Sequence, residues 1–194
     1  MIKLIIFDLD GVLVEAKKIH FESLNDALDE KYKISWEEHL SKYDGLKTNQ
    51  KLEMLTLDKK LPIESYKEIW GKKQINTIKS LRTLSPSIIL SETIQKLSDD
   101  GYKIAVCSNS IRKTVLTVLG KLNIVEFFDL VLSNEDVVNS KPHPELFWKA
   151  MSLMNCLPEE TLIIEDSPTG LLAANRSKAN VMRVSNPKEV TYEN

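Results

Sequence analysis

Residues 3–11, KLIIFDLDG, join an uninterrupted apolar run to two aspartates and a glycine. A short apolar run that ends at a turn signal is typical of a strand buried on both faces. Strands of that kind belong to parallel sheets, whose two faces are both covered by helices. The stretch therefore predicts a first strand that carries Asp8 and Asp10 at its carboxyl end.

The chain after residue 85 alternates strands with helices. Short apolar runs predict strands over residues 103–107, 130–132, 161–164 and 181–184. The helical spacing of apolar residues predicts helices over residues 88–100, 111–122, 144–155 and 169–177. Strands that alternate with helices of about 10 to 15 residues imply right-handed crossovers and a parallel sheet.

Residues 15–84 have a different pattern, without a strand signal. Phe21, Leu24 and Leu28 recur at helical spacing, and Ser35 with Glu38 fits a capping box. Two more helices are predicted over residues 48–55 and 62–81. We therefore predict a doubly wound α/β parallel-sheet core, formed by residues 1–14 and 85–194, with an all-helical insert of residues 15–84.

Composition excludes several classes of protein. The 194 residues include 26 basic and 28 acidic side chains, for a formal net charge of −2, which gives no electrostatic footprint for nucleic acid or an anionic membrane. No apolar run approaches the roughly 18 residues that a membrane span needs. Two cysteines, Cys107 and Cys156, form neither a disulfide framework nor a Cys-x-x-Cys pair. We expect a cytoplasmic protein that binds neither nucleic acid nor membrane.

The unusual polar residues all follow predicted strands. In chain order they are Asp8, Asp10, Ser108, Asn109, Lys141, Glu165 and Asp166. In an open parallel sheet, ligands bind outside the carboxyl ends of the strands. We therefore expect these side chains to converge on one crevice.

Four of these residues are carboxylates, which would repel one another in a crevice without a cation. Oxygen ligands without clustered His or Cys favour Mg²⁺ over zinc. Mg²⁺ is commonly held by one or two carboxylates together with substrate phosphate. Ser108, the amides at the following helix start and the Lys141 ammonium supply donors for a phosphoryl group. The sequence thus predicts a bound Mg²⁺ and a small phosphorylated metabolite as the partner.

Four segments resemble the four motifs of the haloacid dehalogenase-like hydrolase superfamily. They are residues 7–13 (FDLDGVL), 107–110 (CSNS), 140–145 (SKPHPE) and 164–170 (IEDSPTG). Within the superfamily, the chain is similar to the phosphoglycolate phosphatase and beta-phosphoglucomutase branch, whose members carry a helical cap after the first strand. The resemblance implies that residues 15–84 form such a cap and that the protein is a phosphoric monoester hydrolase.

The resemblance also implies roles for the motif residues. Asp8 would be the nucleophile that forms an aspartyl-phosphate, and Asp10 the general acid and then the general base. Mg²⁺ would be held by Asp8, the Asp10 carbonyl and Asp166, with Glu165 assisting. Phosphate would be bound by Ser108, Asn109 and the catalytic Lys141. Dehalogenases and phosphonate-cleaving members lack an aspartate at the position of Asp10, so phosphoryl transfer is expected.

Residues of the predicted cap bear on the choice between phosphatase and mutase. The superfamily's sugar phosphomutases carry an arginine three residues after a cap glycine, whereas here Thr48 stands three residues after Gly45, with Lys47 beside it. Neither side chain reproduces bidentate phosphate binding by arginine. We expect hydrolysis of a small phosphomonoester, with Gly45, Lys47 and Thr48 contacting the substrate. His20 stands where the mutases carry a cap-hinge histidine and is also assigned to the substrate site. The alternatives are a beta-phosphoglucomutase-like mutase and a non-catalytic binding protein of the same fold.

The remaining expectations concern single positions and the end of the chain. Lys73, which aligns with a cap lysine of the mutases, and His39 are expected on exposed helix surfaces. Lys178 stands where relatives have glycine and is expected in the left-handed conformation. The chain ends sooner than most relatives do, which would leave part of the sheet uncovered and predicts a monomer or weak homodimer.

Overall fold

The computed structural model describes residues 1–193, whose strands form a five-stranded parallel sheet in the order β3-β2-β1-β4-β5. The strands are β1 (Leu4–Phe7), β2 (Lys103–Cys107), β3 (Leu130–Leu132), β4 (Thr161–Glu165) and β5 (Asn180–Arg183). The chain runs outward from β1 to β3, then returns to the other side of β1 for β4 and β5. The switch point, where such sheets bind ligands, therefore lies between β1 and β4.

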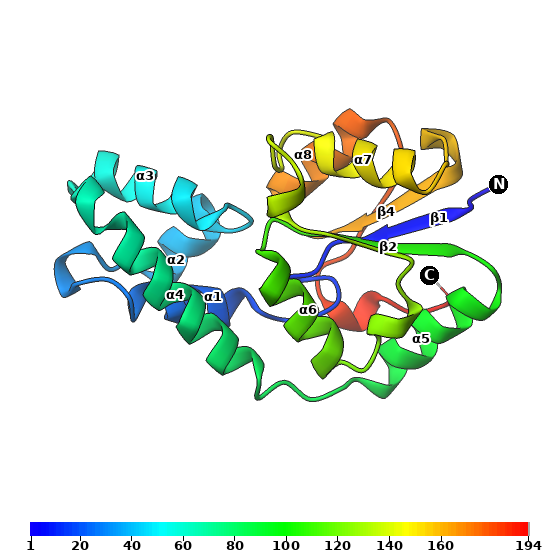
Figure 1. The fold of residues 1–194 in the computed structure, drawn as a ribbon, viewed down its shortest axis with the longest axis horizontal. Helices are drawn as coiled ribbons and strands as arrows, with labels where there is room; N and C mark the ends of the chain where they lie inside the picture. The colour runs from blue at the N-terminus through cyan, green and yellow to red at the C-terminus, as the bar shows by residue number, and fades with distance from the viewer. Residues whose placement is uncertain (194) are drawn as a thin grey trace.

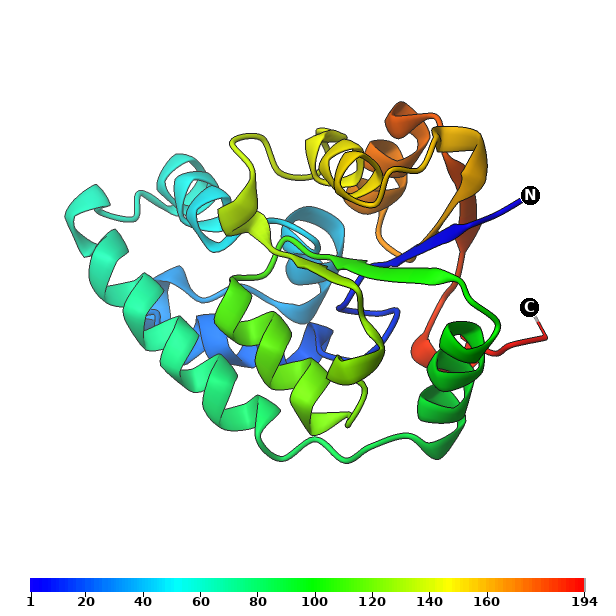
Figure 2. The same ribbon diagram turned by 45° about the vertical axis from the view of Figure 1, so that its right-hand side comes forward.

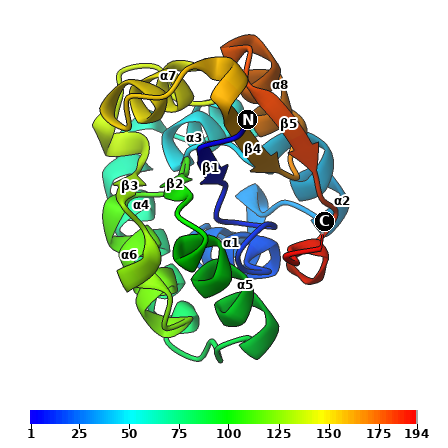
Figure 3. The same cartoon turned by 90° about the vertical axis from the view of Figure 1, so that its right-hand side faces the viewer.

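Helices cover both faces of the sheet (Figures 1 and 3). One face is covered by α5 (Ile88–Asp99) and α6 (Arg112–Lys121), and the other by α7 (Glu145–Leu153) and α8 (Pro168–Ser177). Alternate residues of β1 enter two apolar clusters. Ile5 and Phe7 pack on the side of α5 and α6, whereas Leu4 and Ile6 pack on the side of α7 and α8. The predicted doubly wound α/β fold class is confirmed.

A group of helices lies beyond the carboxyl ends of the strands (Figure 1). It comprises α1 (Lys17–Asn25), α2 (Trp36–Glu38), α3 (Thr48–Lys59) and α4 (Tyr66–Leu81), with a π-helical turn at His39–Tyr43 directly after α2. We call these helices and the loops between them the cap. An apolar cluster of their own, which includes Leu24, Leu52 and Ile69, holds them together. The long helix α4 also packs against α6 of the core (Figure 2).

Element boundaries differ from the sequence predictions by a few residues, for local reasons. Short 3-10 turns occupy Glu30–Tyr32, Ile63–Ser65, Val125–Phe127, Asn134–Asp136, Pro158–Glu160 and Pro187–Glu189. The second of them delays the start of α4 from the predicted residue 62 to Tyr66. α3 continues to Lys59 because the chain reverses only at Lys60, which has a φ of 62°. The left-handed conformation predicted for Lys178 is present, with a φ of 70°.

The prediction that His39 lies on an exposed helix surface is wrong. The residue is fully buried, and its ring stacks on Trp36 at a centroid distance of 5.4 Å and also contacts Phe21. The prediction assumed a regular helix, whereas His39 opens the π-helical turn, whose wider turn rotates side chains away from the regular pattern. The capping box that precedes it is present, since Glu38 N donates to Ser35 Oγ and Ser35 N donates to the Glu38 carboxylate. Across residues 1–193, no helix has the length and apolar character needed to cross a membrane.

Candidate active site

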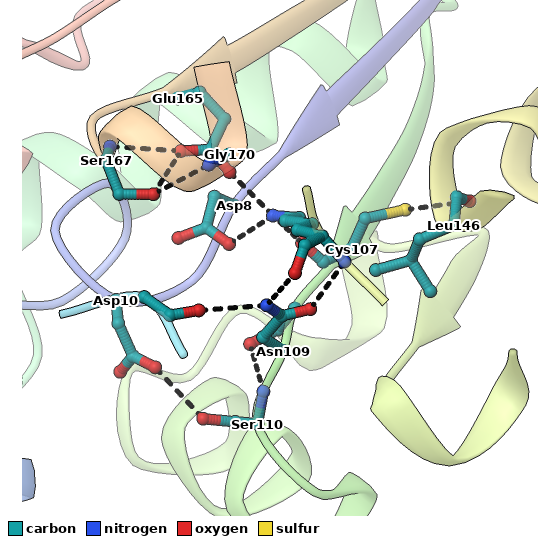
Figure 4. Close-up of polar contacts among 12 residues, drawn as sticks. Asp8, Asp10, Cys107, Asn109, Ser110, Leu146, Glu165, Ser167 and Gly170 are labelled. Carbon is teal, nitrogen blue, oxygen red and sulfur yellow. Dashed lines mark hydrogen bonds and ion pairs between the residues drawn. The ribbon is translucent and has the colours of Figure 1, made fainter. Parts of the chain in front are cut away.

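Asp8 directly follows the central strand and meets the ammonium group of Lys141. Lys141 Nζ lies 2.6 Å from Asp8 Oδ1, 2.6 Å from Glu165 Oε1 and 2.8 Å from the carbonyl oxygen of Cys107 (Figure 4). All these side chains are buried. Burial acts to lower the pKa of Lys141, but the carboxylates of Asp8 and Glu165 outweigh it and raise that pKa. Lys141 is therefore a permanent positive charge beside Asp8.

Glu165 is held in one orientation by the turn that leads into α8. Its Oε2 accepts hydrogen bonds from the N–H and hydroxyl of Ser167 (3.2 and 3.3 Å) (Figure 4). It also accepts one from the backbone N–H of Asp166 (2.9 Å). The carboxylate also lies so close to Gly170 that a Cβ there would come within 1.8 Å of Glu165 Oε1. Glu165 thus orients the Lys141 ammonium and the turn at residues 166–167. A glycine at position 170 leaves room for the Glu165 carboxylate.

Asp166 faces Asp8 across the switch point. Oxygen atoms of Asp8, Glu165 and Asp166 lie within 4.8 Å of one another, and Asp166 Oδ1 is buried without a hydrogen bond to any residue of the range 1–193. Burial raises the pKa of Asp166 to about 6, against the opposing effect of Lys17. A buried carboxylate oxygen without a donor, within an all-oxygen cluster, fits a hard divalent cation. Asp8 and Asp166 are the residues free to hold it, since Glu165 is already engaged by four donors.

The side chain of Asp10 lies outside this cluster, which agrees with the expectation that only its backbone carbonyl would face the metal. Asp10 Oδ2 accepts a 3.0 Å hydrogen bond from Ser110 Oγ (Figure 4). Asp10 Oδ1 lies 3.1 Å from His20 Nε2. Burial acts to raise the pKa of Asp10, but His20 and Ser110 outweigh it and lower that pKa. Burial lowers the pKa of His20. Asp10 and His20 therefore form a close polar pair, whose facing atoms Oδ1 and Nε2 have no hydrogen bond to any residue of the range 1–193.

Lys73 is buried behind this pair, and the expectation that it is exposed is wrong. Its Nζ lies 3.3 Å from His20 Nδ1, and the residue is only 6% exposed. Lys73 stands on the buried face of α4 and not on its solvent face. A single lysine in a helical pattern is usually exposed, so nothing in the sequence indicates this.

Asn109 connects three segments of the site. Its Nδ2 donates hydrogen bonds to the carbonyl oxygens of Gly45 (2.8 Å) and Lys141 (3.1 Å), and its Oδ1 accepts one from Lys141 N (3.1 Å) (Figure 4). Ser108 is buried, and its hydroxyl accepts a bond from Ser110 N. Asn109 therefore positions the loop that carries Lys141, while Ser108 orders the turn before α6.

The cap residues that the sequence assigned to substrate binding line a cavity of about 560 Å³ above Asp8 and Asp10. Gly45 has a φ of 72°, which glycine adopts without strain, and lies against Ser167. Lys47 precedes α3, and Thr48 Oγ1 accepts a 3.3 Å hydrogen bond from Gln74 Nε2. The cavity therefore lies between the sheet and the cap, and its size suits a small metabolite.

Two lysines of the site were missed by sequence reasoning. Lys17 Nζ lies 2.7 Å from Asp166 Oδ2 and 3.5 Å from Asp44 Oδ2, so it connects the start of the cap with the carboxylate cluster. Lys51, on α3, is buried in the cavity wall. Neither stands in a motif. The three-residue spacing of Thr48 and Lys51, which places them on one face of a helix, was the available signal for Lys51.

Comparisons with known proteins agree with this arrangement. A family model described as haloacid dehalogenase-like hydrolase matches residues 5–184. The chain is 29% identical to pyrophosphatase PpaX of Bacillus mycoides, over 95% of this chain and 84% of the relative. It is 25% identical to a phosphorylated carbohydrates phosphatase of Thermotoga maritima, over 88% and 79% of the two chains. The crystal structure of beta-phosphoglucomutase from Clostridium difficile superimposes with a TM-score of 0.81 at 22% identity, over all of this chain and 95% of the other.

Proposed function

The chain belongs to the haloacid dehalogenase-like hydrolase family and is a phosphatase of that family, and we propose that it hydrolyses a small phosphomonoester with Mg²⁺ through an aspartyl-phosphate on Asp8. The observation that carries the proposal is the position of Asp8. Its carboxylate opens into the cavity and lies between a buried ammonium, Lys141, and a second buried carboxylate, Asp166, that has an oxygen without a donor.

The charges around Asp8 suit phosphoryl transfer, which needs positioning and charge neutralisation. Lys141 holds the Asp8 carboxylate in place and adds positive charge where the phosphoryl oxygens gather. A divalent ion held by Asp8 and Asp166 would supply further charge neutralisation. An oxygen-only donor set and a phosphorylated substrate favour Mg²⁺ in that place.

In the first step, Asp8 attacks phosphorus and the bond to the leaving oxygen breaks, which gives an aspartyl-phosphate and an alcohol. Asp10 gives the leaving oxygen its proton. In the second step, Asp10 takes a proton from the water that attacks the aspartyl-phosphate, and inorganic phosphate leaves. His20 Nε2, 3.1 Å from Asp10 Oδ1, lies on the side of the Asp10 carboxylate opposite to Ser110 and helps to hold it in place.

The test is phosphate release from a panel of phosphomonoesters, with Mg²⁺ or with EDTA. The panel contains an aryl phosphate, 2-phosphoglycolate, hexose phosphates and nucleoside monophosphates. We expect Mg²⁺-dependent release that Asp8→Asn abolishes, while the control variant Asp29→Asn, at an exposed cap position, retains it. Release that persists in Asp8→Asn would contradict the covalent route.

A sugar phosphomutase similar to beta-phosphoglucomutase is a second candidate, because His20 and Lys73 lie buried next to Asp10. The products separate the two functions. A mutase converts beta-glucose 1-phosphate into the 6-phosphate when a bisphosphate primer is present, whereas a phosphatase releases inorganic phosphate. We expect inorganic phosphate, because no arginine stands three residues after Gly45.

A further inference from the structure

A lysine of the cap neutralises a carboxylate that is free to hold a divalent ion. Lys17 Nζ lies 2.7 Å from Asp166 Oδ2, and among residues 1–193 it is the only cationic nitrogen within 4 Å of that carboxylate. Lys141 contacts Asp8 and Glu165 but not Asp166. Within that range, the charge of the buried Asp166 side chain is therefore paired with Lys17 alone.

The position of Lys17 in its helix does not favour a positive charge. Lys17 is the first residue of α1, whose first turn contains no acidic residue. The positive end of the helix dipole lies there, so an ammonium group near it is unfavourable by itself. The neighbouring Lys18 side chain extends into solvent, whereas the Lys17 side chain is only 21% exposed. The carboxylate cluster is therefore what holds Lys17 in its inward position.

Asp166 is fixed in place, whereas the Lys17 ammonium has a second carboxylate within reach. A Cβ at Gly11 would come within 2.0 Å of Asp166 Oδ2, so this oxygen lies directly against the backbone of the loop after β1. Lys17 Nζ also lies 3.5 Å from Asp44 Oδ2. Ala16, directly before Lys17, is fully buried. A change of partner from Asp166 to Asp44 thus needs only a rotation of the Lys17 side chain.

Asp44 belongs to the loop through which the cap contacts the sheet. It precedes Gly45, whose carbonyl oxygen accepts the hydrogen bond from Asn109. Asp44 Oδ1 also lies 4.0 Å from His39 Nε2. Burial lowers the pKa of His39 to about 3, so this ring is neutral near pH 7 and does not offset the charge of Asp44. Asp44 is therefore able to accept the whole charge of Lys17.

Resting on the proposed metal dependence, we propose that Lys17 is an internal cation that holds Asp166 in the metal-free protein and passes to Asp44 when a divalent ion binds. An ammonium and a divalent ion on one buried carboxylate would repel each other strongly. The change of partner removes this repulsion and strengthens the contact between α1 and the loop at residues 44–45, which lines the cavity. Lys17 is thus a positioning residue that couples metal binding to the cap.

Titration calorimetry with MgCl₂ tests the competition at Asp166. Lys17→Met should bind Mg²⁺ at least about 10-fold more tightly. Lys17→Arg keeps the charge and should keep the weaker affinity of the unmodified protein. Asp44→Asn should bind Mg²⁺ about 2- to 5-fold more weakly, because Lys17 then loses its alternative partner. Lys18→Met and Asp29→Asn, at exposed positions of the cap, are the controls and should leave the affinity unchanged.

A double-variant cycle separates a change of partner from a general effect of charge. Asp44→Asn removes a negative charge near the site, which by itself weakens the binding of a cation. If Asp44 acts through Lys17, Asp44→Asn should have no further effect in a protein that already carries Lys17→Met. An equal effect of Asp44→Asn in both backgrounds, or an unchanged affinity in Lys17→Met, would overturn the proposal.

Hydrogen exchange tests the coupling to the cap. Asp44 N donates to His39 O (2.8 Å) and Leu46 N donates to Tyr43 O (3.3 Å), so these two amides report on the loop. Mg²⁺ should slow their exchange by about 2- to 5-fold in the unmodified protein, and should not do so in Lys17→Met or Asp44→Asn. The same slowing in all three proteins would overturn the coupling.

Folding of the variants is checked by urea denaturation in EDTA. Lys17→Met should show a cooperative transition at a lower urea concentration, because Asp166 loses its counter-charge. Asp44→Asn leaves every contact of Asp166 in place, so it carries the test if Lys17→Met does not fold.

The outcomes are distinct from those that test the proposed function. Tighter Mg²⁺ binding by Lys17→Met without phosphate release from any ester would contradict only the phosphatase. Mg²⁺-dependent phosphate release with equal Mg²⁺ affinities in Lys17→Met and the unmodified protein would contradict only the role of Lys17. Absence of Mg²⁺ binding in every protein of the series would overturn both.

Discussion

The side-chain amide of Asn109 joins the end of β2 to the carbonyl oxygen of Gly45 in the cap, through a hydrogen bond of 2.8 Å. The same amide group bonds to both backbone polar groups of Lys141. A single side chain therefore links the cap to the sheet and also positions the lysine beside Asp8.

Asn109→Ala should impair both stability and activity. The loss of three half-buried hydrogen bonds predicts a decrease of about 1–3 kcal/mol in the free energy of unfolding, measured by urea denaturation. We also expect a lower kcat, because Lys141 loses its backbone anchor. Asn175→Ala is the matched control, since the exposed Asn175 amide bonds only within its own helix. Equal effects of the two variants would contradict a special role for Asn109.

Lys17→Met should tighten the binding of Mg²⁺. The Lys17 ammonium lies 2.7 Å from Asp166 Oδ2, so it repels a divalent ion that uses the same carboxylate. Two unit charges about 4 Å apart interact with about 4 kcal/mol at an effective dielectric constant near 20, so removal of the Lys17 charge predicts an affinity increase of at least about 10-fold after screening by solvent. The measurement is titration calorimetry with MgCl₂, which needs no turnover. Lys18→Met, at the exposed neighbouring position, should leave the affinity unchanged.

Alanine substitutions at two glycines should have opposite effects on stability. A Cβ at Gly170 would come within 1.8 Å of Glu165 Oε1, so Gly170→Ala forces the carboxylate or the turn to move, at a cost of about 1–3 kcal/mol. Gly120 lies in α6 with no atom within 4 Å of the same added carbon. Gly120→Ala should therefore stabilise the protein by up to about 1 kcal/mol. Thermal unfolding of both variants measures the two changes in stability. A Gly120→Ala variant that is less stable than the unmodified protein would show that the room around the added Cβ does not decide the effect of the substitution.

Buried His39 predicts acid sensitivity. Burial lowers its pKa to about 3, and nearby cations such as Lys51 act in the same direction. Below pH 6.5 the unfolded chain binds a proton that the folded protein does not bind. The free energy of unfolding should therefore decrease as the pH decreases from 6.5 towards 3, by up to about 1.4 kcal/mol per pH unit from this group.

His39→Leu should flatten that pH dependence, as measured by urea unfolding at pH 4.5, 5.5 and 7. His143→Leu is the control, because the His143 side chain is 45% exposed. A pH dependence that stays unchanged in His39→Leu would exclude His39 as its source.

The sheet and the positions of the motif residues could be predicted because both follow from short-range patterns. Apolar runs as short as three residues defined the strands. The carboxyl ends of parallel strands lie at one edge of the sheet, which brings Asp8, Asn109 and Asp166 together. Lys17 and Lys51 were not predictable in the same way. A lysine in a helical pattern is usually solvated, and what makes each of these different is a cavity or carboxylate supplied by a distant segment.

His39 and Lys73 show a second limit of the sequence pattern. Helical periodicity assigns faces under the assumption of a regular helix with one buried side. The π-helical turn violates the first assumption, and a helix that faces both an apolar cluster and a polar cavity violates the second. The polar pair of Asp10 and His20 was open to prediction only through the family resemblance.

The central place of β1 in the sheet has a consequence for amide hydrogen exchange. Its four residues are 0–4% exposed, and the strand is paired with β2 on one side and β4 on the other. Amides in such a strand exchange only when the whole core opens, whereas the cap helices can exchange through local opening. Asp8 therefore stands next to the slowest-exchanging part of the chain. Local opening of the cap helices should therefore leave the exchange of residues 4–7 unchanged.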